Sequence, residues 1–397
     1  MQPLRLTAFS LITCLGSGLE AMLAALQAGR SGLNRRRFEG GLTTAVGEVV
    51  LPLHSPLSRA LSDFDCRNNR LAALALQDGA FADAVAAARE RYGARRIGVF
   101  LGTSTSSVAS TEQAYRHRDA RTGELPADYR YAHTHNTFAL GALTARMFQL
   151  SGPAVVISAA CATTAKAFGN AARMIAAGFC DAAIVGGADS LCATTLYGFR
   201  ALGLTAEGPC RPFDEARDGL SLGEAAGFTL LEKSEGRGNR GDILLLGLGE
   251  SNDAHHMSTP DPRGQGARLA MERALASAGL GTREIDYINL HGTATRVGDA
   301  AEDAAVTQVF GSQTPCSSTK GATGHTLGAA GIVEAIISVL ALRHDLMPGS
   351  PNTQTLDPSL RCRYLLEPRS GRVARVMSNS FGFGGSNCSL ILGRTAP

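Results

Sequence analysis

The chain has 397 residues, of which 44% are hydrophobic and 18% are charged, as in a soluble globular protein with one large or two medium domains. The formal net charge of +3 is too small to indicate a nucleic-acid-binding protein. No apolar run is long enough to span a membrane, so we expect no membrane insertion.

The nine cysteines are scattered and include no Cys-x-x-Cys pair. This pattern argues against a disulfide framework or a zinc ribbon, and it favours a reducing compartment such as the cytoplasm. The first residues carry little positive charge, and a threonine precedes Cys14. We therefore expect a buried first strand there and not a lipoprotein signal.

Short apolar runs alternate with small-residue helical patterns, which predicts an α/β fold. The predicted strands are residues 4–7, 96–101, 154–158, 182–185, 227–231, 243–248, 287–290, 375–378 and 388–392. The predicted helices are residues 18–28, 69–92, 164–178, 264–278, 300–310 and 328–343. Because several helices are rich in alanine, we expect them to be buried and closely packed.

A polar, glycine-rich stretch at residues 233–241 is the best boundary between two halves, residues 1–236 and 237–397. The halves resemble each other. Val-Phe-Leu-Gly-Thr-Ser-Thr at 99–105 parallels Asn-Leu-His-Gly-Thr-Ala-Thr at 289–295, and in both an apolar strand runs into Gly-Thr-x-Thr. This similarity indicates a duplicated α/β unit.

A candidate nucleophile, Cys161, lies in Ser158-Ala-Ala-Cys161, where a predicted strand runs directly into a predicted helix. The partial positive charge at a helix N-terminus favours a thiolate over a thiol. Small neighbouring residues leave room for a substrate. The alternative interpretation is a buried structural cysteine, the usual fate of a free thiol.

Two histidines lie in comparable positions. His291 follows a predicted strand, at the edge where α/β sheets bind ligands, although a lone histidine is more often structural. His325 directly follows Ser317-Ser-Thr-Lys320-Gly-Ala-Thr-Gly. Lys320 in this stretch is one of only three lysines in the chain, and the other two are Lys166 and Lys233. This stretch is no P-loop, because no Gly-Lys-Ser/Thr follows its glycines.

A glycine-rich turn at residues 381–385 follows the strand predicted at 375–378. Its backbone N–H groups are candidates for binding an oxyanion. The turn lacks the glycine spacing of a dinucleotide-binding loop.

Together these stretches resemble the elongating β-ketoacyl-acyl-carrier-protein synthases of the thiolase superfamily. The resemblance runs nearly end to end. Its motifs are Arg211-Pro-Phe-Asp-Glu-Ala-Arg-Asp-Gly219, Gly223-Glu-Ala-Ala-Gly227, His291-Gly-Thr-Ala-Thr, Gly298-Asp-Ala-Ala-Glu302, Ser318-Thr-Lys-Gly-Ala-Thr-Gly-His325 and Asn379-Ser-Phe-Gly-Phe-Gly-Gly385. It implies a thiolase-like, duplicated fold of five layers, α/β/α/β/α.

The resemblance also implies a role for each matching residue. Cys161 is the nucleophile, His291 and His325 are the catalytic histidines, and Lys320 hydrogen-bonds within the site. The remaining residues support the reaction or bind the substrate: Asp299 and Glu302 as supporting carboxylates, Glu334 as the partner of Lys320, Thr293 and Thr295 as pantetheine contacts, and Phe383 as the gating residue whose N–H joins that of Cys161 in an oxyanion hole.

The implied reaction is a decarboxylative condensation. Cys161 takes an acyl group from acyl carrier protein, and the two histidines, donating from neutral Nε2–H groups, hold the oxygen of a malonyl thioester as carbon dioxide leaves. No metal or redox cofactor is expected for this reaction. Both substrates are carried on the phosphopantetheine of acyl carrier protein.

Several positions depart from the housekeeping enzymes. Thr103-Ser-Thr-Ser-Ser107 replaces a glycine-rich turn, Lys166 stands where histidine is common, and Ala225 replaces a usual glycine. The stretches Arg67-Asn-Asn-Arg70 and Gly102-Thr-Ser-Thr-Ser resemble synthases of bacterial aryl-polyene gene clusters. That subgroup implies a polyunsaturated aryl-acyl primer.

The resemblance also implies partners. Family members are dimers with the strand before the nucleophile at the interface, and some pair with a chain-length-factor relative that lacks the cysteine. Acidic carrier proteins dock on basic patches. Arg35-Arg-Arg37 is a candidate patch, and a solvated run of charge is the alternative interpretation.

The residues argue against a thiolase, a non-catalytic partner subunit and a histidine metal site. A thiolase needs a second catalytic cysteine, and Cys388 lies beyond the C-terminal glycine-rich turn in a predicted strand. A non-catalytic partner subunit usually lacks the nucleophile, which is present here. A metal site at His133-x-His135 or His255-His256 has no further ligand pattern to support it.

Overall fold

The N-terminal half of the chain forms one five-stranded part of the central sheet. A computed structural model describes residues 1–50, 53, 55–234 and 240–395. The strands are β1 (Leu4–Thr13), β5 (Ile97–Gly102), β6 (Ala154–Ile157), β7 (Ala182–Asp189) and β9 (Ala225–Lys233), in the spatial order β6-β5-β7-β9-β1. β5 runs parallel to β6 and β7, whereas β9 is antiparallel to β7 and β1.

The C-terminal half repeats this topology. Its strands are β10 (Ile243–Asn252), β11 (Tyr287–Asn289), β12 (Pro315–Ser317), β16 (Arg375–Gly382) and β17 (Ser386–Arg394), in the order β12-β11-β16-β17-β10, with β14 (Arg363–Tyr364) outside β12. β11 runs parallel to β12 and β16, and β17 is antiparallel to β16 and β10. Order and direction match the first half strand by strand, which confirms the predicted duplication.

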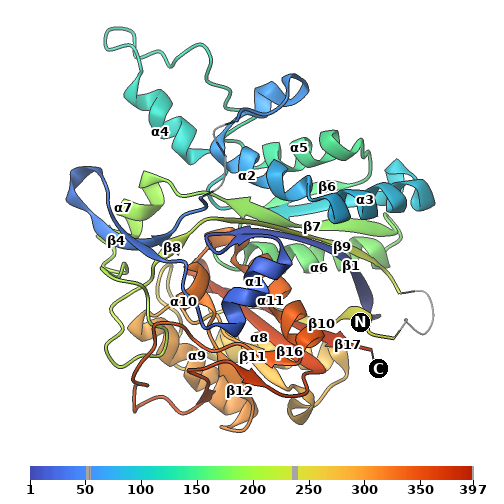
Figure 1. Cartoon of the computed structure of the whole chain (residues 1–397), viewed down its shortest axis with the longest axis vertical. Helices are drawn as coiled ribbons and strands as arrows, with labels where there is room; N and C mark the ends of the chain where they lie inside the picture. Colours follow the sequence, from blue (N-terminus) through green and yellow to red (C-terminus); the bar gives the residue numbers. More distant parts are fainter. Residues whose placement is uncertain (51–52, 54, 235–239, 396–397) are drawn as a thin grey trace.

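The helices form three layers around the two halves of the sheet (Figure 1). α6 (Thr163–Ala176) and α11 (Ala330–His344) lie between them: α6 packs on β5 and β7, and α11 packs on β9, β16 and β17. The outer helices are α2 (Arg67–Leu76), α3 (Gly79–Tyr92) and α5 (Phe138–Phe148) on the N-terminal half, and α8 (Gln265–Ala278) and α9 (Arg296–Phe310) on the C-terminal half. The five predicted layers, α/β/α/β/α, are therefore present.

Up to Leu342, α11 is apolar apart from Glu334 and Ser338, and it is covered on all sides. Every residue from Ala330 to Leu342 is buried. By length and composition the segment 327–344 could span a membrane, but 89% of it is buried inside the molecule. A helix that is hydrophobic all round belongs in the core of a large protein, and α11 lies there.

The remaining elements surround the two halves. They are α1 (Leu19–Gln27), α4 (Val108–Arg116), α7 (Ala193–Ala201), α10 (Lys320–Thr323), β2 (Gly16–Ser17), β13 (Leu346–Met347) and β15 (Arg369–Ser370), together with a small sheet of β3 (Asn34–Arg37), β4 (Thr43–Gly47) and β8 (Leu222–Gly223). α4 and the chain that follows it project from the body (Figure 1, top left).

The single helix predicted for residues 69–92 is wrong. The chain forms α2 and α3, which meet at a bend of 72°. Asp78 starts the second helix, because its side chain accepts a hydrogen bond from the Phe81 N–H at 3.2 Å. The helices α4, α5, α7 and α10 were not predicted, and neither was the strand β12. In the predicted boundary at 233–241, residues 235–239 lie outside the described residues, and the division into two domains stays a prediction.

Close packing of α6 against α11 depends on a glycine, and this gives a testable prediction. A Cβ at Gly331 would lie 2.5 Å from the backbone nitrogen of Ala165 on α6, whereas a Cβ at Gly198 on α7 would meet nothing within 4 Å. We expect Gly331→Ala to lower the free energy of unfolding by about 1–3 kcal/mol. The matched control Gly198→Ala should raise it by roughly 0.5–1 kcal/mol. Urea unfolding measures both, and equal effects would contradict the packing argument.

Candidate active site

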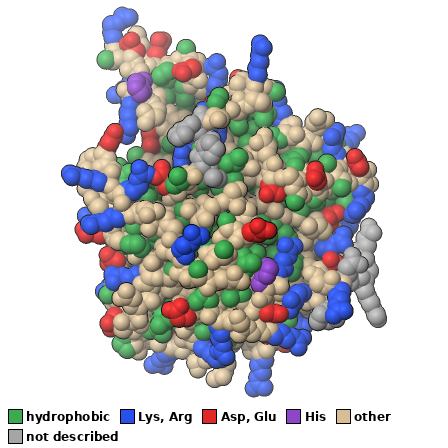
Figure 2. Space-filling view, in the orientation of Figure 1, with side chains coloured by type: hydrophobic (Ala, Val, Ile, Leu, Met, Phe, Trp, Pro, Cys, Tyr) green, Lys and Arg blue, Asp and Glu red, His purple; other side chains and the backbone are tan. Residues whose placement is uncertain are grey.

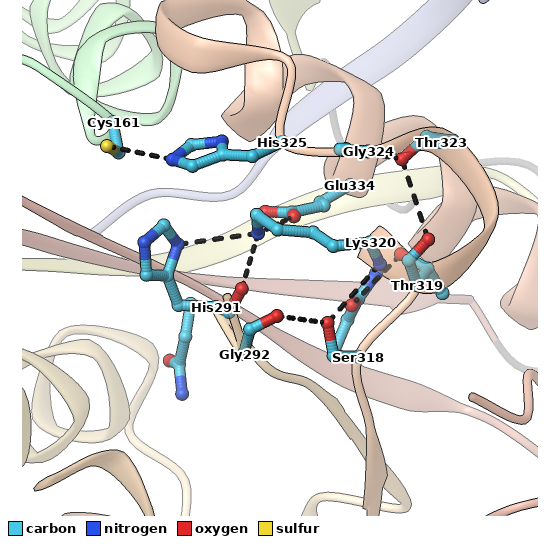
Figure 3. A network of polar contacts seen from close by, with 12 residues as sticks. Cys161, His291, Gly292, Ser318, Thr319, Lys320, Thr323, Gly324, His325 and Glu334 are labelled. Carbon is cyan, nitrogen blue, oxygen red and sulfur yellow. Dashed lines mark hydrogen bonds and ion pairs between the residues drawn. The ribbon is translucent and has the colours of Figure 1, made fainter. Parts of the chain in front are cut away.

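Three turns from distant parts of the chain bring a thiol and two imidazoles together (Figure 3). Cys161 lies between β6 and α6, His291 follows β11, and His325 lies between α10 and α11. Nε2 of His325 lies 2.9 Å from Sγ of Cys161, and the two imidazole centroids are 5.3 Å apart with nearly perpendicular planes. All three side chains are buried. The structure thus brings together the three residues singled out from the sequence: Cys161 at a strand-to-helix turn, His291 at a strand end and His325 in a glycine-rich turn before a helix.

The backbone after His325 fixes which ring nitrogen carries the proton. The N–H of Leu327 donates to Nδ1 of His325 at 3.2 Å. In a neutral imidazole the acceptor nitrogen carries no proton, so the proton is on Nε2, which faces Cys161. Burial and then the Lys320 ammonium lower the pKa of His325 well below its usual value, which keeps the ring neutral.

His291 is held in the same tautomer by Lys320. The Lys320 ammonium contacts Nδ1 of His291 at 3.4 Å, donates to the His291 carbonyl oxygen, and forms a buried ion pair with Glu334. Burial lowers the pKa of His291, with Lys320 and His325 adding to the effect. Burial raises the pKa of Glu334 to about 7, against the attraction of Lys320. Both imidazoles are therefore neutral Nε2–H donors.

The turn that carries His291 is fixed by two carboxylates on successive turns of one helix. Glu302 on α9 accepts hydrogen bonds from the N–H groups of His291 (2.8 Å) and Gly292 (2.7 Å). Asp299, one turn earlier, accepts from the N–H of Ala294 at 3.1 Å. Burial raises the pKa of Glu302 to about 7 and that of Asp299 to about 6. Asp299 thus shapes the turn from outside the cavity, whereas Glu302 lines the cavity and both of its oxygens accept from the turn.

Burial opposes the effect of the helix N-terminus on Cys161. Burial raises the pKa of the Cys161 thiol to about 11, although Lys320 and the backbone N–H of Phe383 act in the opposite direction. Desolvation of a charged sulfur outweighs the helix N-terminus here. The backbone before the sulfur is strained, since Ala160 has a φ of 48°.

The glycine-rich turn lies against Cys161. A Cβ at Gly382 would be 3.0 Å from the Cys161 nitrogen, which places the Phe383 N–H beside the sulfur. This turn is tied to the loop after β10, because the Gly384 N–H donates to the Met257 oxygen (2.7 Å) and the Asp253 N–H to the Gly385 oxygen (2.9 Å). The predicted oxyanion-hole donors are thus adjacent.

A cavity of about 520 Å³ leads to the three residues. Its lining includes Phe383 together with Thr293 and Thr295, whose hydroxyls lie 3.0 Å apart. Cys161 is its one cysteine; Cys388 is buried in β17 and does not line it. The arrangement leaves room for an extended chain to reach one nucleophilic sulfur.

The same three residues are the group of described side chains with the geometry to hold a metal ion, since their ligand atoms lie within 4.8 Å of one another. The hydrogen bonds at both Nδ1 atoms argue against that use. They place a proton on each Nε2, and a protonated nitrogen has no lone pair for a metal. No metal group forms at His133 and His135 or at His255 and His256 in the described chain.

Sequence reasoning missed two buried groups that support the site. Arg217, in the motif at residues 211–219, pairs with Asp299 (3.5 Å) and Asp357 (2.7 Å). Asp189, at the end of β7, accepts hydrogen bonds from the turn after β5 and from Ala329. Arg217 lies within a motif already quoted for the family resemblance, and that motif is the signal that could have found it, whereas no local signal marks Asp189. Both groups are paired or hydrogen-bonded, as buried charges almost always are.

Comparison with known proteins gives a consistent picture. Residues 66–236 match the model "Beta-ketoacyl synthase, N-terminal domain" and residues 244–354 match "Beta-ketoacyl synthase, C-terminal domain". A 3-oxoacyl-[acyl-carrier-protein] synthase 2 from Vibrio cholerae is 34% identical over 98% of both chains. The match to the mitochondrial 3-oxoacyl-[acyl-carrier-protein] synthase of Arabidopsis thaliana is 43% identical over 62% of this chain, but it spans only 57% of that enzyme's length.

Solved structures show the same fold. A ketosynthase (ApeO) from Xenorhabdus doucetiae, solved in complex with its chain length factor (ApeC), superposes with a TM-score of 0.91 at 37% identity. The alignment covers 99% of this chain and 98% of that one.

The raised pKa of Cys161 predicts how its alkylation depends on pH. Because the pKa is about 11, the thiolate fraction and the alkylation rate should rise about tenfold per pH unit from pH 7 to 9. Lys320→Met should slow alkylation, since it removes the charge that favours the thiolate. Lys166→Met, on α6 a few residues after Cys161, is the matched control. Mass spectrometry of the Cys161 peptide after iodoacetamide treatment measures the rate, and a plateau below pH 8 would contradict the prediction.

Proposed function

The chain belongs to the β-ketoacyl synthase family, and from this premise we propose that it condenses malonyl-acyl carrier protein with an acyl group held on Cys161. The observation that carries the proposal is the pair of Nε2–H donors, one on His291 and one on His325, beside a single buried sulfur that lines the cavity. The enzyme is accordingly an acyltransferase of the 3-oxoacyl-[acyl-carrier-protein] synthase class.

The first half-reaction is an acyl transfer. The Cys161 thiol loses its proton as its sulfur attacks the thioester carbonyl of the acyl carrier. The carrier's pantetheine sulfur leaves with the electron pair and takes up a proton, so the transfer neither gains nor loses a proton overall. The negative oxygen formed in between accepts hydrogen bonds from the N–H groups of Cys161 and Phe383. These groups already lie next to the sulfur, so they need no rearrangement to stabilise the developing charge.

The second half-reaction uses the two histidines. As the malonyl carboxylate leaves as carbon dioxide, its bonding electrons form an enolate, whose oxygen accepts the two Nε2–H groups. The enolate carbon then attacks the acyl carbonyl on Cys161 and expels the Cys161 thiolate. Neutral imidazoles suit this step, because they donate hydrogen bonds to the oxygen without giving up a proton and quenching the carbanion.

The substrates arrive on a carrier arm. Thr293 and Thr295 line the same cavity as His291, and they are the residues proposed to hydrogen-bond the pantetheine amides. The reaction as written needs no metal or redox cofactor, since decarboxylation supplies the carbanion.

The proposed pathway is the assembly of a polyunsaturated aryl chain. It is supported by the hydroxyl-rich turn at residues 103–107 and by Arg67-Asn-Asn-Arg70. Similarity to the ketosynthase ApeO along almost the whole chain agrees with this subgroup. Primary fatty-acid elongation is the competing pathway, supported by the named 3-oxoacyl-[acyl-carrier-protein] synthases. Mass analysis of the acyl group trapped on Cys161 distinguishes the two.

Two kinds of partner follow from this proposal. The relatives' names give acyl carrier protein as the substrate carrier. A second subunit is proposed to pair along β6, an apolar edge strand whose outer side has no neighbouring strand in the described chain.

The candidate carrier patch, Arg35 to Arg37, lies on exposed β3, where Arg35 pairs with Glu207 and Arg36 with Glu48. Basic and acidic groups are likewise mixed over the face shown in Figure 2.

Two alternatives fit the site less well. A thiolase requires a second cysteine beside the first, and Cys388 lies in the core away from the cavity. A non-catalytic partner subunit has no use for a sulfur that lines a cavity 2.9 Å from an imidazole.

The separate roles of Cys161 in acyl transfer and His325 in condensation can be tested by measuring each half-reaction alone. His325→Ala should still acquire an acyl group on Cys161 but condense at least about 10²-fold more slowly, because the enolate loses a donor. Cys161→Ala should still release carbon dioxide from malonyl carrier but form no condensation product. Radiolabelled acyl and malonyl carriers report both reactions, with His344→Ala, exposed at the end of α11, as control. Unimpaired condensation by His325→Ala would overturn the assigned role.

The proposed interface is tested separately. Val155→Lys places an unpaired charge on edge strand β6, and we expect this variant to be a monomer. Phe179→Lys, at an exposed site beyond α6, is the control and should leave the mass unchanged. Light scattering of the chain alone, and co-expressed with a chain-length-factor subunit, gives the masses. An assembly that persists in Val155→Lys refutes this interface.

A further inference from the structure

A buried carboxylate outside the cavity connects the turns that carry the nucleophile and a histidine. Asp189 ends β7 and is fully buried. Its Oδ1 accepts from the hydroxyls of Thr103 (2.8 Å) and Thr105 (2.7 Å), and from the N–H groups of Ser104 (2.8 Å) and Thr105 (2.7 Å). Its Oδ2 accepts from the N–H of Ala329 at 3.1 Å. Five hydrogen bonds thus converge on one side chain.

One side of this arrangement leads to the nucleophile. The Ser104 hydroxyl donates to the carbonyl oxygen of Ala160 at 3.5 Å, and Ala160 is the strained residue directly before Cys161, with φ at 48°. Ser106 in the same hydroxyl-rich turn is also left-handed, with φ at 42°, and its N–H donates to the Thr103 hydroxyl at 2.8 Å. A strained turn persists only where its surroundings hold it, and Asp189 holds the turn that contacts Ala160.

The other side leads to the histidine. Ala329 closes the short turn after His325, and Leu327 in that turn has φ at 54° while its N–H donates to Nδ1 of His325. Gly328 lies between them, and a Cβ there would approach Oδ2 of Asp189 to 2.8 Å and Oγ of Ser104 to 2.6 Å. The turn therefore lies directly on the Asp189 carboxylate and on the hydroxyl-rich turn.

We propose that Asp189 is a positioning residue that sets Cys161 and His325 in register with each other, through the hydroxyl-rich turn at residues 103–107 on one side and the turn at residues 327–329 on the other. This inference rests on the proposed function, since it assigns a role within the same reaction. It also explains the departure at residues 103–107: a glycine-rich turn has backbone donors only, whereas Thr103 and Thr105 each add a hydroxyl donor to the carboxylate.

The chemistry of the side chain makes the proposal specific. All five partners are donors to Asp189, so both of its oxygens must accept. Asparagine has the same shape but offers one oxygen and one NH₂ group. In either orientation that NH₂ faces an N–H or O–H donor, so at least one turn is pushed away. An unmatched buried donor is costly, and the turn is expected to move to relieve it.

The test uses the full chain with Asp189→Asn and Thr105→Val, and with Thr144→Val as the matched control. Thr144 is a buried threonine on α5 whose hydroxyl bonds only within its helix, to the Leu140 carbonyl oxygen. We measure kcat and KM for malonyl-carrier decarboxylation, the rate of Cys161 alkylation by iodoacetamide, and the thermal unfolding midpoint.

We expect Asp189→Asn to lower kcat about 10–100-fold, the cost of misplacing catalytic groups by a fraction of an ångström to one ångström, with KM changed by less than about twofold. Thr105→Val should lower kcat about fivefold, and it keeps the proposal testable if Asp189→Asn does not fold. Alkylation of Cys161 should slow in both variants, and Thr144→Val should behave as wild type.

The outcomes separate this inference from the proposed function. Wild-type chain that does not decarboxylate malonyl carrier refutes the proposed function. Active wild type, together with folded Asp189 and Thr105 variants of normal kcat and alkylation rate, refutes the positioning role alone. A lower unfolding midpoint with unchanged kcat would make Asp189 a purely structural residue, which also overturns the proposal.

Discussion

The site depends on where two protons sit on two buried rings. Burial and the Lys320 ammonium keep both imidazoles neutral, and donors at each Nδ1 force the remaining proton onto Nε2. Lys320 is itself held by Glu334 and by the His291 carbonyl, so one buried ion pair sets the electrostatics of both rings. The same Lys320 ammonium lowers the pKa of both histidines and of the Cys161 thiol. The protonation states of the three groups are therefore coupled through one cation.

Much of this architecture was predictable from sequence, for identifiable reasons. Strands such as β5 and β7 are short apolar runs bounded by turn residues, and alanine-rich α6 is compatible only with close packing. The three reactive side chains were found because each stands at a strand or helix end. Their mutual distance was not readable from spacing, since Cys161 and His325 are 164 residues apart. Only the resemblance of the motifs to a known family brought them together in advance.

The misses have physical causes too. Propensity over residues 69–92 favours one long helix, but a capping aspartate and a bend allow two short helices to follow the sheet. The helix N-terminus led us to expect a thiolate, whereas burial, which depends on residues from the other half, decides the Cys161 pKa. Asp189 was overlooked because its partners come from two other turns, so nothing local distinguishes it from an ordinary aspartate at a strand end.

The repeated topology bears on how such a site can arise. β6 leading into α6 in one half corresponds to β12 leading into α11 in the other, and the two helices pack together at the centre of the molecule. Equivalent turns therefore meet across a pseudo-twofold axis, one presenting a sulfur and the other an imidazole. After duplication of an ancestral gene, two copies of a single loop would already face each other there. Different residues in two equivalent turns are enough to give unlike chemical groups at contact distance.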